Sequence, residues 1–150
     1  MEQCFIRYIY EFFEKLIKFY GFKKKREVKG ESYMVEYESN SLGVKIEKYF
    51  REFYALLYKI DRPDYEINLF NLLEYLKQDD DKKIKSNYFR SEEDIEEGYK
   101  KQINHISSVI YENWDLISDF FSGDNYEFKV AEFERYWKNK YPELYKKVDE

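Results

Sequence analysis

The stretch that decides the fold is residues 33–60, YMVEYESNSLGVKIEKYFREFYALLYKI. Apolar and charged side chains alternate along residues 33–37 and again along residues 44–46, a period of two that is typical of half-buried β-strands. Residues 53–58 are apolar on both faces, which predicts the most buried strand, and residues 39–43 are rich in turn formers. We therefore predict an antiparallel meander of three or four strands. The connection near Arg51-Glu52 contains no Gly or Pro, so the sequence leaves that hairpin boundary open.

Helical periodicity surrounds this strand region on both sides. Charged and apolar residues segregate with a period of 3.6 over residues 4–20, and Gly21 is suited to end that helix. Asn68, Ser91 and Asp124 are suited to cap three later helices, of which the second reaches Ser122. The sequence thus predicts one α+β domain over residues 1–150, with an N-terminal helix, the meander, and several C-terminal helices packed on the sheet.

The reactive side chains are too few for most chemistry. Cys4 is the single cysteine and His105 the single histidine, so neither an internal disulfide nor a usual zinc site is expected. No phosphate-binding loop, nucleophile elbow or dinucleotide fingerprint occurs, and we expect no enzymatic activity, metal or cofactor. No uncharged apolar run approaches ~20 residues, and charges interrupt the N-terminal segment, so we expect no membrane span, no secretory signal and a cytoplasmic location.

Charge is unevenly distributed along the chain, whose formal net charge is −5. Residues 1–60 hold 12 Lys/Arg against 9 Asp/Glu, whereas residues 91–127 hold ten acids against two lysines. An acidic helix face with aromatic side chains beside it is typical of a surface that meets a basic protein, although an ordinary solvated face has the same composition. The candidate partner-binding residues are Glu93, Glu97, Tyr111, Glu112, Trp114, Asp115 and Asp119, the two aromatic ones as anchors if they are exposed.

A second class of function starts from the basic run Lys23–Arg26. This run borders a sheet rich in Tyr and Phe, and aromatic platforms beside positive charge can stack the bases of single-stranded nucleic acid. The competing interpretation is structural, with the rings packed against helices and the lysines on a solvated strand edge. The alternative to a protein-binding domain is therefore a single-stranded nucleic-acid-binding module.

The layout also resembles a known class of proteins. The segments that carry the resemblance are Tyr20-Gly21-Phe22, Tyr33-Met34-Val35-Glu36-Tyr37, Val44-Lys45-Ile46, an aromatic strand to Tyr58, and Phe121-Ser122-Gly123-Asp124. Over residues 5–140 the chain is similar to small bacterial proteins associated with immunity to polymorphic toxins. The resemblance implies a non-enzymatic cytoplasmic protein that binds and blocks a cognate toxin, frequently a nuclease. It carries no set of binding residues across to this chain.

Overall fold

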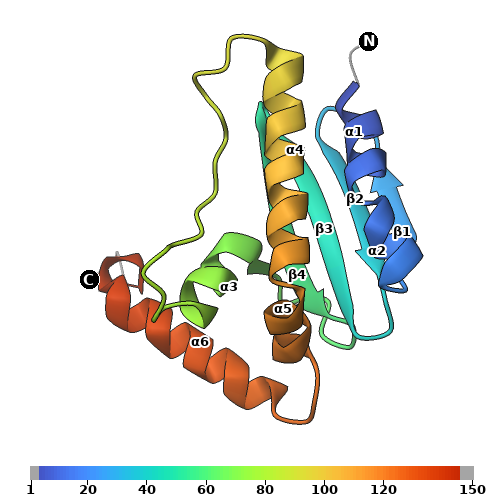
Figure 1. Ribbon diagram of the computed structural model, residues 1–150. Coiled ribbons are helices and arrows are strands. Elements are labelled where there is room, and N and C mark those ends of the chain that lie inside the picture. The colour runs from blue at the N-terminus through green and yellow to red at the C-terminus, as the bar shows by residue number, and fades with distance from the viewer. Residues whose placement is uncertain (1–3, 146–150) are drawn as a thin grey trace.

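A computed structural model describes residues 4–145 and contains one antiparallel sheet with helices before and after it (Figure 1). The strands are β1 (Lys23–Val28), β2 (Tyr33–Glu38), β3 (Leu42–Tyr49), β4 (Glu52–Lys59) and β5 (Ile67–Asn68). The helices are α1 (Cys4–Phe12), α2 (Glu14–Phe19), α3 (Leu69–Leu76), α4 (Ile95–Glu112), α5 (Trp114–Phe121), α6 (Tyr126–Lys140) and the short 3-10 helix η1 (Pro142–Tyr145).

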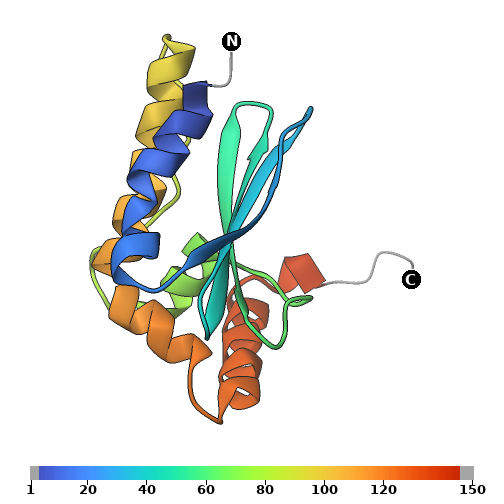
Figure 2. The same ribbon diagram turned by 90° about the vertical axis from the view of Figure 1, so that its right-hand side faces the viewer.

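The sheet has the strand order β1-β2-β3-β4-β5, so each strand pairs with its neighbour in sequence. Helices α1 and α4 lie side by side on one face of it, as Figures 1 and 2 show from two directions. The α+β prediction is confirmed, with five strands instead of three or four. The sequence pattern undercounts them because β1 is exposed along most of its length and β5 has only two residues.

The core lies between this face of the sheet and the helices. Alternate residues of β2, β3 and β4 point toward α1 and α4, and their exposed fractions do not exceed 2%. These strand residues are Tyr33, Val35, Tyr37, Leu42, Val44, Ile46, Phe53, Ala55 and Leu57. The helices bring apolar stripes to the same cluster, including Ile9 and Leu16 before the sheet and Ile103 and Ile110 after it. Burial of these stripes is what holds the layers together.

Helix boundaries follow the sequence at two places. Asn68 caps α3 as expected, because its Oδ1 accepts from the backbone N–H groups of Phe70 at 2.9 Å and Asn71 at 3.2 Å. The helix predicted to reach Ser122 is broken at Asn113, a polar residue at the centre of its apolar stripe, where a break is plausible from the sequence; the side-chain amide donates to the Val109 carbonyl at 2.8 Å. Within residues 4–145, no helix combines the length and apolarity that crossing a membrane requires.

Three expectations about helix boundaries are wrong. Residues 4–20 form two helices because Phe13 leaves the helical conformation between α1 and α2. Asp94, not Ser91, caps α4: its Oδ1 accepts from the Glu96 and Glu97 N–H groups, so the helix begins three residues later than expected. Helix α6 begins after Asn125 without a side-chain cap, so Asp124 does not serve as its N-cap.

The other face of the sheet carries a buried polar network. The Tyr58 ring lies across the strand at Gly43, and its hydroxyl lies 2.9 Å from Glu36 Oε2 and 2.7 Å from Glu38 Oε2. Glu36 also accepts from Arg26 Nε at 2.9 Å. Burial raises the pKa of Tyr58, and these carboxylates raise it further, so the hydroxyl stays a donor at neutral pH. The network depends on Gly43 having no side chain.

We therefore expect Gly43→Ala to lower the free energy of unfolding by about 2–3 kcal/mol. A Cβ atom there would lie 2.5 Å from the Tyr58 hydroxyl oxygen, so the ring must move and its bonds to Glu36 and Glu38 must break. Urea unfolding measures the change. The control is Gly30→Ala, where the nearest atom to a new Cβ is 4.0 Å away. Equal stability of the two variants would contradict this account of Tyr58.

Candidate protein-binding surface at the hairpin end

Two exposed aromatic rings lie at the tip of the β3–β4 hairpin. Tyr49 pairs with Glu52, so the connection is the two-residue loop Phe50-Arg51. The side chains of Tyr49 and Phe50 are 59% and 76% exposed, and their ring centroids are 4.4 Å apart in an edge-to-face arrangement. Phe50 has a φ of +55°, a conformation for which such loops normally use glycine. The tip thus combines exposed apolar surface with backbone strain.

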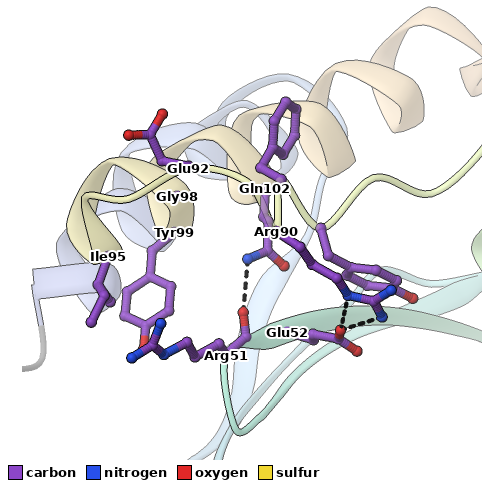
Figure 3. A pocket seen from close by; sticks show the side chains of 10 residues that line it. Arg51, Glu52, Arg90, Glu92, Ile95, Gly98, Tyr99 and Gln102 are labelled. Carbon is purple, nitrogen blue, oxygen red and sulfur yellow. Dashed lines mark hydrogen bonds and ion pairs between the residues drawn. The ribbon is translucent and has the colours of Figure 1, made fainter.

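Contacts from α4 and α1 hold this loop in place. Gln102, buried on α4, accepts from the Phe53 N–H through Oε1 at 3.0 Å. Its Nε2 donates to the Arg51 carbonyl at 2.8 Å, as Figure 3 shows. Lys48 Nζ donates to the Phe50 carbonyl at 2.5 Å while it lies 5.3 Å from the centre of the Phe5 ring on α1. Both loop carbonyls are therefore bonded, and the tip is anchored to two helices.

A hollow of about 110 Å³ opens beside the tip. Its walls come from the hairpin at Arg51 and Glu52, from the segment 88–92, and from the first turns of α4 (Figure 3). Phe89 lines it and has a φ of +50°. Within residues 4–145, Phe50 and Phe89 are the two non-glycine residues with positive φ. Backbone strain in this protein is thus concentrated around one hollow, as is typical of binding sites.

An ion pair joins the segment 88–92 to the hairpin. Arg90 donates to Glu52 Oε2 through Nε at 2.7 Å and also through Nη2. The Tyr54 hydroxyl donates to the other oxygen of Glu52 at 2.5 Å. The hydrogen bond from Tyr54, together with Arg90, holds the pKa of Glu52 below its ordinary value, and the same bond raises the pKa of Tyr54 to about 12. Glu52 is therefore ionised and neutralised by Arg90 near pH 7.

An acidic run, residues 92–97, follows directly at the start of α4. Figure 2 shows this end of α4 at the same end of the molecule as the β3–β4 tip. Three of its acids have structural roles: Glu92 pairs with Lys101 at 2.6 Å, Asp94 caps the helix, and Glu96 accepts from the Tyr8 hydroxyl at 2.8 Å. The other two, Glu93 and Glu97, are exposed and form no ion pair with any residue in 4–145. We call this surface, from Tyr49 to Glu52 and from 88 to 99, the hairpin end.

The acidic residues selected from the sequence form two groups. Glu93 and Glu97 belong to the hairpin end, whereas Glu112, Asp115 and Asp119 lie where α4 meets α5. Fifteen residues of helix separate Glu97 from Glu112, which corresponds to ~22 Å. The expected continuous acidic face is therefore two separate acidic clusters, with the two lysines at 100 and 101 between them.

Tyr111 and Trp114 contribute to packing between helices. The Tyr111 hydroxyl donates to the Phe12 carbonyl at 2.8 Å, and its ring stacks on Tyr20 with centroids 5.9 Å apart. The Trp114 ring lies 4.5 Å from that of Tyr20. Both rings are half-buried, so the exposure on which their anchoring role depended is only partial. The rings that are more exposed are those of Tyr49 and Phe50, which the sequence marked only by a hairpin connection without Gly or Pro.

The surface for the nucleic-acid alternative is occupied by internal contacts. Lys24, Lys25 and Arg26 form ion pairs with Glu27, Glu38 and Glu36. The rings on the face toward the helices are buried and Tyr58 lies in the polar network, so the freer rings of the sheet are Tyr49 on β3 and the half-buried Tyr54 on β4. The basic run lies on β1, which β2 separates from these two strands, so the described residues do not bring the run and the free rings together on adjacent strands. Among residues 4–145, no group of three His, Cys, Asp or Glu side chains is placed to hold a metal ion.

The positive φ of Phe50 predicts that glycine is more stable than alanine at this position. We expect Phe50→Gly to be more stable than Phe50→Ala by about 1 kcal/mol, because alanine keeps the cost of a positive φ and glycine does not. The control is Phe19, also exposed but at the end of α2, where glycine should instead be less stable than alanine. Urea unfolding of the four variants measures both differences. Glycine less stable than alanine at position 50 would contradict the strained tip.

Comparison with known proteins gives no family for this chain. It matches no protein-family model, no curated protein and no solved structure. The similarity to immunity proteins therefore remains a resemblance carried by the segments quoted from the sequence. Any conclusion about function depends on the hairpin end itself: an anchored and strained aromatic tip, a neighbouring hollow, and two carboxylates that form no ion pair within residues 4–145.

Proposed function

We propose that this protein is a non-enzymatic protein-binding domain that binds and neutralises a basic protein toxin, in the manner of the immunity proteins it resembles. The observation that supports this most strongly is the exposed pair Tyr49 and Phe50 on a strained, anchored loop. Exposure of an aromatic side chain to water is unfavourable, and burial of the ring in an interface would relieve this cost. Backbone strain of this kind is typical of binding sites. The pair has the properties of a binding hot spot.

Insertion of the tip into a partner accounts for both properties. Burial of one exposed aromatic side chain contributes roughly 1.5–3 kcal/mol to binding. Because Gln102 and Lys48 already bond the loop carbonyls, little conformational entropy remains to be lost when the partner closes around the tip. The hollow beside Arg51 and Glu52 receives a complementary side chain from the partner.

The charge of the hairpin end favours a basic partner. Glu93 and Glu97 are exposed and have no ion-pair partner within residues 4–145, so they attract positive charge at a distance and pair with it on contact. Arg90 is already neutralised by Glu52 and does not oppose this attraction. We place the protein in the cytoplasm, where a single unpaired cysteine is stable and where an immunity protein meets a toxin active inside the cell.

The second acidic cluster is a separate candidate contact for the same partner. Asp115 and Asp119 border a shallow hollow together with Leu116, whose side chain is 40% exposed. A partner of standard size reaches both clusters, since an interface of ~800 Å² per side is more than 22 Å across. A partner that touches one cluster only would be insensitive to charge changes at the other.

The test begins with the tagged protein in an extract of its native host, and continues with the purified partner. We expect Phe50→Ser to weaken binding at least tenfold, which corresponds to about 1.4 kcal/mol. The matched control is Phe19→Ser on α2. Phe19 is 73% exposed, close to the 76% of Phe50, and its replacement should leave the affinity for the partner unchanged. Equal affinity of the two variants would show that the tip does not bind the partner.

Charge reversal of matched pairs then locates the acidic contact. Glu93→Lys/Glu97→Lys and Asp115→Lys/Asp119→Lys each reverse two exposed acids four residues apart, the first pair around the start of α4 and the second within α5. We expect the first pair to reduce the association rate and its salt dependence more than the second. Co-expression completes the test, because wild-type protein should relieve growth inhibition by the partner and Phe50→Ser should not. A partner that causes no growth inhibition would refute the toxin-neutralising role while leaving protein binding in place.

A further inference from the structure

A long segment without helix or strand runs alongside α4. Residues 77–94, here the strap, run from the end of α3 to the start of α4 (Figure 1). Connections of this length are uncommon and are usually either disordered or functional. This one is fastened: Ile84 packs on the core, and His105 Nε2 donates to the Lys85 carbonyl at 2.8 Å. Lys83 Nζ also donates to the Gln78 carbonyl at 2.9 Å.

The strap forms one wall of an open groove of about 690 Å³. The opposite wall is the C-terminal half of α4, with Ser108, Val109 and Asn113 facing the groove. No Phe, Tyr or Trp side chain lines it, so its surface offers charge and hydrogen bonds but no platform for stacking. This groove lies apart from the hollow at the hairpin end, with which it shares no lining residue.

Although the protein as a whole is acidic, lysines gather along the groove. Four line it, against the two carboxylates Asp80 and Glu112. Lys77 lies 3.4 Å from both Asp80 and the Asn113 side-chain oxygen. The other three form no ion pair with any residue in 4–145, and the acids at 79 and 81 do not line the groove. These three lysines are Lys82, Lys83 and Lys85.

This arrangement suits an anion that carries several charges in a row. Three ammonium groups carried on a fastened strap attract negative charge, and the Ser108 hydroxyl on the opposite wall can donate a hydrogen bond to it. Lysine binds phosphate as a point charge, without the planar geometry that arginine imposes. We propose that the strap groove is a binding site for an oligophosphate chain, either free or as part of a nucleotide. This site is independent of the proposed partner-binding surface.

The test is a titration of the full chain with sodium tripolyphosphate at low salt. Calorimetry measures the affinity, and backbone amide NMR locates the binding site. We expect saturable binding, with shifts at Ser108, Asn113 and residues 82–85. The variant Lys82→Gln/Lys83→Gln/Lys85→Gln should weaken it at least tenfold. The control Lys23→Gln/Lys29→Gln/Lys138→Gln removes the same charge from three exposed lysines outside the groove, and should bind like wild type.

Each outcome decides the proposal. Loss of binding confined to the groove variant supports it, and a parallel titration with ATP then distinguishes a nucleotide from a free oligophosphate. No saturable binding, or an equal loss in both lysine variants, would overturn it, because attraction would then follow net charge alone. Far-ultraviolet circular dichroism of both variants shows whether the fold is retained, which we expect because the substituted side chains are exposed.

Discussion

The arrangement at the functional end depends on one buried amide, the side chain of Gln102. It lies on α4 with 3% of its surface exposed, and both of its polar ends are bonded to the hairpin, at the Phe53 N–H and the Arg51 carbonyl. A buried amide that loses a partner costs about 1–3 kcal/mol, so the helix and the hairpin are held in one register. That register brings the start of α4, with its acids, beside the tip, and it sets the width of the hollow between them.

This anchoring explains how an unfavourable conformation persists. Phe50 has positive φ and an exposed ring, two features that each oppose folding. The loop does not relax because its two carbonyls are bonded by Lys48 and Gln102, which belong to the sheet and to α4. The stability of the core therefore maintains a strained surface. A preorganised tip of this kind binds with a smaller entropic loss than a mobile one, which is the physical link between the fold and the proposed inhibition of a partner.

Periodicity in the sequence was sufficient for the fold, because β2, β3 and β4 alternate clearly and the helices carry apolar stripes. It was not sufficient for the site. A period of 3.6 places Glu97 and Glu112 on related faces but contains no axial distance, so two clusters were taken for one. Trp114 was expected to be an exposed anchor. Its ring packs against that of Tyr20, and this tertiary contact cannot be read from the spacing of residues in the sequence. The strain at Phe50 is a single backbone angle: the absence of Gly and Pro marks this connection in the sequence but does not say which residue takes the positive φ.

The central claim is that the hairpin tip is rigid before any partner binds. Nitrogen-15 relaxation of the free protein measures it directly, through the backbone order parameters of Phe50 and Arg51. We expect values of about 0.85, equal to those of the paired residues in β3 and β4, because both loop carbonyls are held. Values below about 0.6 at these two residues would show a flexible loop and would contradict the account of a preorganised binding tip.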